Sequence, residues 1–96
     1  MPSVKSPAAQ LQVRETIKTS VTVKREGEFA QHLENARKYR EFSLDAAACR
    51  EYFRAFENLP MSSRERVGKQ VDDAKGDYDK GRFAEAAEKL ENALKP

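Results

Sequence analysis

Apolar side chains recur at helical spacing over most of this chain. In four successive segments they fall three or four positions apart, which gathers them on one face of a helix. The segments cover about residues 26–41, 43–58, 62–80 and 83 onward; Leu59-Pro60 and Gly81 separate them, and Ser43 is expected to cap the second. The pattern predicts an all-α fold of four helices with short connections, packed as two stacked antiparallel helical hairpins. The expected core positions are Phe29, Leu33, Ala36, Ala48, Tyr52, Ala55, Phe56, Val67, Val71, Ala74, Tyr78, Phe83, Ala86, Ala87, Leu90, Ala93 and Leu94.

The chain before residue 26 follows a different pattern. Between Val13 and Val23 the β-branched apolar residues occupy odd positions and most polar residues occupy even ones. This alternation predicts a short strand, best formed over Thr19–Arg25. A single strand cannot satisfy its own backbone, so it would need a partner chain. We therefore expect residues 1–25 to be a basic arm, either flexible or a short strand, before a four-helix domain at 26–96 with hairpins 26–60 and 61–96.

The two predicted hairpins are similar in sequence. Sliding the chain on itself by 38 residues places Phe29 on Val67 and brings Ser43 onto Gly81 at the turn between helices. A duplicated helical hairpin is the simplest explanation of this match. The other matching pairs, each small with small or apolar with apolar, are Leu33 with Val71, Ala36 with Ala74, Ala48 with Ala86, Tyr52 with Leu90, Ala55 with Ala93, and Phe56 with Leu94.

The stretch DYDKGRFAEAAEKLENALKP (77–96) resembles the second half of a tetratricopeptide repeat. That family has a glycine at the turn between its helices, an aromatic residue two positions later, and small residues where neighbouring helices approach. These positions are Gly81, Phe83, Ala86 and Ala93 here, and small residues leave room for the adjoining helix. The resemblance covers residues 29–96, since the first unit matches at Ala36, Tyr39, Ala48, Tyr52, Ala55, Phe56 and Pro60.

The tetratricopeptide resemblance implies an inner groove that presents Arg37, Arg40, Lys75 and Tyr78. Such a surface suits an acidic or C-terminal peptide segment. The function we expect is that of a small non-enzymatic protein–protein interaction module: an adaptor, chaperone or inhibitor that binds another protein or an acidic peptide.

Residues 19–56 also resemble the ribbon-helix-helix family of dimeric repressors and antitoxins. In that family one strand from each chain pairs with its mate, and the two-stranded ribbon enters the major groove of DNA. TSVTVKR (19–25) would be the ribbon, with Ser20, Thr22 and Lys24 toward base edges and Ser43 on a phosphate. The alternative function is therefore a dimeric DNA-binding regulator or antitoxin whose second hairpin binds a partner.

Charge and composition restrict the partners and the cellular compartment that we expect for this protein. The chain has a net charge of +2, but residues 1–25 carry five basic side chains and one acidic one, which suits an acidic partner, nucleic acid included. The single cysteine, Cys49, excludes an internal disulfide. No apolar run is long enough for a membrane span, and the start of the chain lacks the apolar region of a secretory signal. We expect a cytoplasmic protein, monomeric or homodimeric, that does not bind a membrane.

The sequence contains no constellation typical of an enzyme. His32 and Cys49 are the only histidine and the only cysteine, and no flanking motif marks a Cys–His couple. The acidic run DDAKGDYDKG (72–81) lacks the ligand pattern of a calcium loop, since Gly81 stands where an oxygen ligand belongs. We expect no catalytic residues, no metal site and no cofactor.

Overall fold

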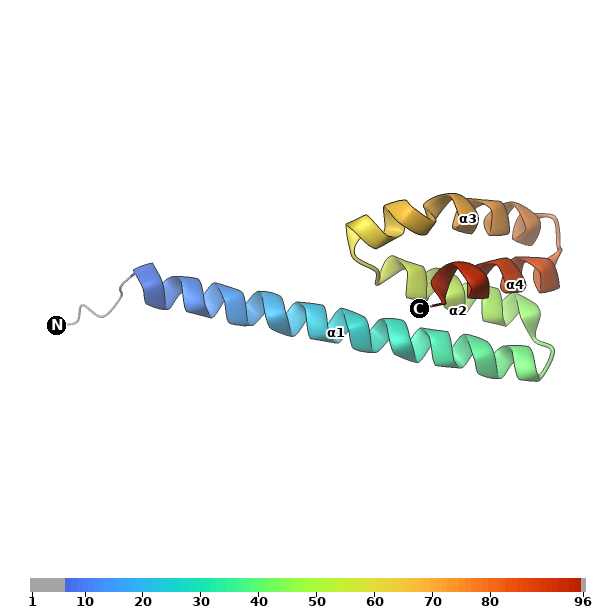
Figure 1. The fold of residues 1–96 in the computed structure, drawn as a ribbon. Coiled ribbons are helices and arrows are strands. Elements are labelled where there is room, and N and C mark those ends of the chain that lie inside the picture. The colour runs from blue at the N-terminus through green and yellow to red at the C-terminus, as the bar shows by residue number, and fades with distance from the viewer. Residues whose placement is uncertain (1–6, 96) are drawn as a thin grey trace.

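Four helices form the part of the chain that the computed structural model describes, which is the backbone of residues 7–95 and the side chains of residues 23–95. They are α1 (Pro7–Glu41), α2 (Asp45–Glu57), α3 (Met61–Asp79) and α4 (Phe83–Leu94). α1 packs antiparallel to α2 and α3 packs antiparallel to α4 (Figure 1). The predicted all-α fold of two helical hairpins is confirmed.

The first helix is much longer than predicted. The strand expected over Thr19–Arg25 is wrong, because these residues lie within α1. Val13, Ile17 and Val21 also lie four positions apart, a spacing that a helix shares with the alternating pattern. An unpaired strand leaves backbone groups without partners, whereas each residue added to an existing helix gains a hydrogen bond. Residues 7–25 of the expected arm are therefore helical, and residues 1–6 lie outside the described residues.

The turns that close the two hairpins have the same geometry. Ser43 and Gly81 both take a positive φ, 60° and 80°, which ends α1 and α3 in a left-handed residue. The amides of Ser43 and Gly81 donate to the carbonyls of Arg40 and Tyr78, at 3.0 Å in both turns. The next amide donates back across each turn, from Leu44 to Tyr39 at 2.9 Å and from Arg82 to Asp77 at 2.8 Å. The match of Ser43 with Gly81 is thus confirmed in three dimensions, with Ser43 as the terminator of α1 rather than the N-cap of α2.

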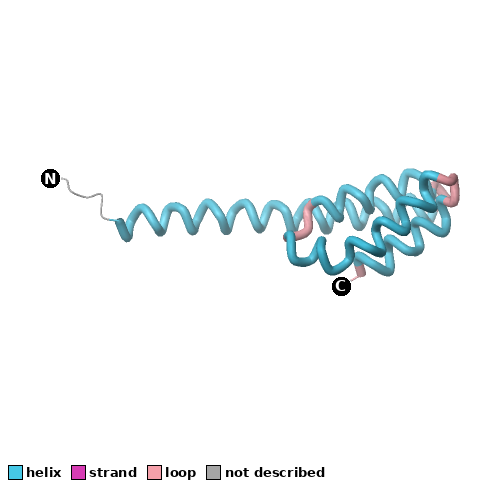
Figure 2. Tube along the Cα trace, turned by 90° about the horizontal axis from the view of Figure 1, so that it is seen from above, coloured by secondary structure: helices cyan, strands magenta, loops and turns pink. Residues whose placement is uncertain are grey.

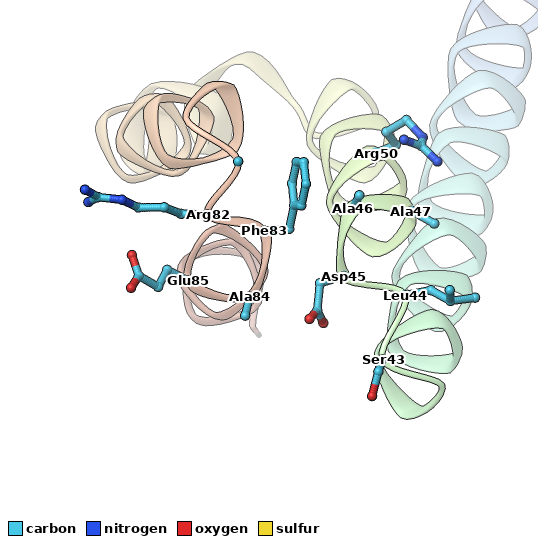
Figure 3. Close-up of a pocket in the computed structure, with 11 residues that line it drawn as sticks. Ser43, Leu44, Asp45, Ala46, Ala47, Arg50, Arg82, Phe83, Ala84 and Glu85 are labelled. Carbon is cyan, nitrogen blue, oxygen red and sulfur yellow. The ribbon is translucent and has the colours of Figure 1, made fainter.

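The hairpins meet through α2 and α4, which lie between α1 and α3 (Figures 1 and 3). α2 and α4 run in the same direction, so both turns lie at one end of the bundle, which we call the turn end. Contacts across the interface are reciprocal: Arg40 of α1 pairs with Glu91 of α4, and Tyr78 of α3 packs on Phe53 of α2. Positions 40 and 78, and 53 and 91, correspond in the repeat, so an approximate two-fold axis relates the hairpins.

The core is rich in alanine along α2 and α4. Ala48, Ala55, Ala86 and Ala87 have no exposed surface. Small side chains at these positions let the helix axes come close, while the large fully buried Tyr52 and Leu90 fill the space between them. The remaining core residues are Leu33, Ala36, Cys49, Val67, Val71, Ala74, Ala93 and Leu94.

α1 continues past the end of the bundle opposite the turns. α3 begins at Met61, whose counterpart in the repeat is Val23, so Pro7–Thr22 have no equivalent in the second hairpin. Figures 1 and 2 show this part of α1 running as a single helix beyond the other three. We call Pro7–Thr22 the α1 extension.

The alanine packing predicts a large difference between two neighbouring positions on α4. Ala86→Leu should lower the free energy of unfolding by about 1–3 kcal/mol, because the added atoms overpack a fully buried position. Ala84→Leu is the matched control; this exposed position should change stability by less than about 0.5 kcal/mol. Urea denaturation followed by circular dichroism measures both. Equal effects at the two positions would contradict the close approach of α2 and α4.

The turn geometry predicts opposite effects of substitutions at the two left-handed positions. Gly81→Ala should cost about 1 kcal/mol, because alanine is strained at a φ of 80°. Ser43→Gly relieves the same strain at a φ of 60° and should leave stability unchanged or raise it slightly. Denaturation midpoints of the two variants provide the test, and a stabilising Gly81→Ala would refute the left-handed turn.

Candidate functional site

A hollow lies at the turn end of the bundle. It encloses about 580 Å³ between the starts of α2 and α4, and we call it the turn-end pocket (Figure 3). Because α2 and α4 are parallel and adjacent, the first turns of both helices border the same space. The pocket is lined by Ser43, Leu44, Asp45, Ala46, Ala47, Arg50, Gly81, Arg82, Phe83, Ala84 and Glu85.

Apolar side chains are unusually exposed around this pocket. Phe42 is 74% exposed and Leu44 is 52% exposed, although both are large hydrophobic residues. Phe83 projects into the space between α2 and α4 (Figure 3), where its ring packs against Tyr78 at a centroid distance of 5.2 Å. Sequence analysis missed Phe42 and Leu44, although two large apolar residues beside a predicted turn were a visible signal.

The polar character of the pocket comes from two helix N-termini and from the charged side chains of Asp45, Arg50, Arg82 and Glu85. The N-cap residues Leu44 and Arg82 make no side-chain capping hydrogen bond, so their side chains leave the first-turn amides of both helices uncapped. Asp45 and Glu85 in these first turns offset part of the positive helix ends. Figure 3 shows Asp45 directed into the gap between the helices and Glu85 directed away from it.

A second hollow lies between α2 and α3 and encloses about 420 Å³; we call it the α2–α3 groove. Its apolar lining is formed by Phe53, Phe56, Val71 and Tyr78, with Phe53 and Tyr78 packed edge to face at 5.6 Å. Charged residues surround this lining, and none of them forms an ion pair with any other residue of the described chain. They are Arg50, Glu57, Asp72, Lys75 and Asp79.

Glu91 is the centre of a polar network between the hairpins. Its carboxylate accepts hydrogen bonds from Arg40 and from the Tyr52 hydroxyl, at 3.1 Å for Tyr52, and Arg37 lies 3.4 Å away. The side chain is only 28% exposed. Burial raises the pKa of Glu91, but the hydrogen bonds and the two arginine charges outweigh it, so the pKa lies below its usual value. Glu91 was not predicted from the sequence. The one sign of its role is that this charged residue occupies the repeat position that Phe53 occupies in the first hairpin.

Tyr52 and Arg40 respond to the same network. Burial and the neighbouring Glu91 charge raise the pKa of Tyr52 to about 12, so its hydroxyl remains a donor at neutral pH. Burial lowers the pKa of Arg40, but hydrogen bonding to Tyr52 and Glu91 raises it further than burial lowers it. The three groups thus hold α1, α2 and α4 together through charged and neutral hydrogen bonds.

The four residues predicted to line a groove lie in two separate places. Arg37 and Arg40 on α1 reach Glu91 of α4, whereas Lys75 and Tyr78 on α3 line the α2–α3 groove. A common groove would need α1 and α3 to be neighbours, but α2 and α4 lie between them (Figure 3). The structure therefore brings together each pair but not the set of four.

The residues of the DNA-binding alternative lie at opposite ends of α1. Lys24 is exposed on α1, and Ser43 is exposed in the turn that follows this helix. Ser20 and Thr22 lie in α1, and their side chains are outside the described residues. The helical backbone at 19–25 places these positions on a helix instead of a ribbon.

His32 and Cys49 have different partners. The His32 ring lies 2.9 Å from Glu51, which also accepts a hydrogen bond from Asn35 at 3.2 Å. Cys49 has no exposed surface, and its thiol donates to the backbone carbonyl of Phe83 at 3.4 Å. Burial, with the Asp45 charge second, raises the pKa of Cys49 to about 11, which keeps the thiol protonated at neutral pH. Cys49 serves the contact between α2 and α4.

Comparisons with known proteins returned no matching family model, no matching curated protein and no matching solved structure. Among the described residues, no group of three or more His, Cys, Asp or Glu side chains is arranged to hold a metal ion. No described helix combines the length and apolar character needed to cross a membrane.

The Glu91 network predicts a pH-dependent effect of one substitution. Because the folded-state pKa of Glu91 is lowered, its stabilisation is present above the unfolded-state pKa and is lost as the pH falls through the folded-state value. Glu91→Gln should therefore lower the free energy of unfolding by about 1–2 kcal/mol at pH 7 and by much less at pH 3. Glu88→Gln on the exposed face of α4 is the control and should have little effect at either pH. A pH-independent loss for Glu91→Gln would contradict the assignment.

Proposed function

We propose that this protein is a small non-enzymatic protein–protein interaction module that binds a partner segment at the turn-end pocket. The observation that carries the proposal is the exposure of Phe42 and Leu44 beside a 580 Å³ hollow whose inner surface includes Phe83. Large apolar side chains exposed next to a concave surface are more typical of interaction sites than of ordinary protein surface. The proposal assigns no chemical step to the chain.

The chemistry of the pocket favours a partner segment that combines an apolar side chain with a carboxylate. The apolar side chain would contact Phe42, Leu44 and Phe83. The carboxylate would accept from first-turn amides of α4, because Glu85 is directed away from the gap whereas Asp45 is directed into it and offsets the positive end of α2. This is the acidic or C-terminal peptide class expected from the sequence, transferred from the predicted groove to the turn end.

The setting we propose is the cytoplasm. A single cysteine that is buried among core residues suits a reducing compartment. DNA binding through residues 19–25 stays a prediction of the sequence, and no described contact adds support to it, so we develop only the protein-binding function.

Site-directed photocrosslinking tests the proposed function. A photoreactive amino acid at Ala84, which is exposed and lines the pocket, should form covalent adducts with a discrete partner in cells that produce the protein. Adding Phe42→Ser and Leu44→Ser should reduce these adducts at least about tenfold, because apolar contacts of this size are worth more than 1 kcal/mol. The thermal midpoint should change little, since both residues are exposed.

The matched control for the crosslinking places the same photoreactive group at Glu65, an exposed residue of α3 away from the turn end. It should give no adduct of the same mass. Equal adducts from positions 84 and 65, or adducts that survive the double substitution, would refute binding at the turn-end pocket.

A further inference from the structure

The α1 extension is a helix whose sequence does not favour a helix in isolation. Pro7–Thr22 includes Val13, Thr16, Ile17, Thr19 and Val21, all β-branched residues with low helix propensity. As the continuation of α1 the extension needs no nucleus of its own, but helices in proteins are stabilised mainly by packing, and residues of low helix propensity depend on it most. The extension runs past the bundle in both views of the molecule (Figures 1 and 2). We therefore expect this helix to be stabilised by packing against a surface outside its own bundle.

The approximate two-fold axis relates the contact between α1 and α4 to the contact between α3 and α2, and these two places differ. Between α1 and α4, Arg37 and Arg40 reach across to Glu91. At the related place between α2 and α3, Phe53 stands in the position of Glu91 and Tyr78 in that of Arg40. Among the described residues, no ion pair joins α2 to α3 at this place. The aromatic side chains there line the open α2–α3 groove.

The charges around the α2–α3 groove complement the α1 extension. Glu57, Asp72 and Asp79 are exposed carboxylates without an ion pair among the described residues, opposed by Lys75 and by Arg50. Arg50 lines this groove as well, so three carboxylates face two basic side chains and the lining carries a formal net charge of −1.

The α1 extension and the residues that follow it carry the opposite charge. Within the extension the sequence contains Arg14 and Lys18 against the single Glu15, interspersed with apolar residues, and Lys24 and Arg25 follow directly after it. A basic segment of this kind matches an apolar floor bordered by carboxylates.

We propose that the α1 extension of one copy docks in the α2–α3 groove of a second copy, so that the chain forms a reciprocal homodimer. A two-fold arrangement fills both grooves with both extensions and leaves no unsatisfied site for further addition. Of the residues that line the groove, only Arg50 also lines the turn-end pocket, so the pocket remains available to its own partner in the proposed dimer.

A charge-exchange experiment on the full chain tests the dimer. In sedimentation velocity, the wild-type protein should show a species of twice the 10.9 kDa chain mass, weakened by added salt. Reversing the groove charges with Asp72→Lys and Asp79→Lys should weaken self-association at least about tenfold. Reversing the extension with Arg14→Glu and Lys18→Glu should do the same. A 1:1 mixture of the two variants should restore the dimer, because the basic extension of the groove variant then meets the unchanged groove of its partner, and the acidic extension of that partner meets the basic groove.

The control variant reverses two exposed carboxylates outside the groove, Glu65→Lys and Glu88→Lys, and should dimerise like the wild type. Circular dichroism confirms that each variant keeps its fold. A wild-type protein that stays monomeric at high concentration overturns the proposal, and so does a dimer that survives both reversals or a mixture that stays monomeric. None of these outcomes bears on photocrosslinking at the turn-end pocket, so the two proposals fail separately.

Discussion

The close packing of α2 against α4 is the constraint on which the rest of the structure depends. These two helices carry most of the fully buried residues, and direct contacts tie them together, from the Cys49 thiol to the Phe83 carbonyl and from the Tyr52 hydroxyl to Glu91. Alanines without exposed surface line both helices, so there is room for a close approach but none for larger side chains. Because the second helix of each hairpin forms the centre, the first helices α1 and α3 are kept apart on the outside.

The approximate two-fold axis makes the differences between the hairpins informative. The turns are the same to within 0.1 Å in their cross-turn hydrogen bonds, and the core positions correspond. The contacts between the hairpins differ at two related places. The Glu91 network lies between α1 and α4, whereas the edge-to-face pair of Phe53 and Tyr78 lies between α2 and α3. The two similar hairpins thus meet at one place that is closed by charged groups, between α1 and α4, and at one that stays open as an aromatic groove, between α2 and α3.

The candidate binding surfaces follow from this arrangement. Since α2 and α4 are parallel, their N-termini meet at the turn end, and the residues of both turns border one pocket. The left-handed residues Ser43 and Gly81 let the backbone reverse sharply in each hairpin. Phe42 and Leu44, which flank Ser43, are left on the outside of the fold. Tyr78 packs against both Phe53 of the α2–α3 groove and Phe83 of the turn-end pocket, so an aromatic row connects the two hollows.

The helical spacing of apolar residues and the 38-residue repeat were enough to determine four helices, two hairpins and the pairing of Ser43 with Gly81, because these features depend on local periodicity and on turns within one hairpin. The tertiary structure alone decided which helices face each other, since Arg37 and Lys75 occupy equal repeat positions yet lie on opposite sides of the α2–α4 pair. It also decided the state of residues 19–25, whose alternating pattern fits a strand only if another strand is present. The sequence pattern determines which face of each helix is apolar. Which helices pack together depends on how closely those faces can approach one another.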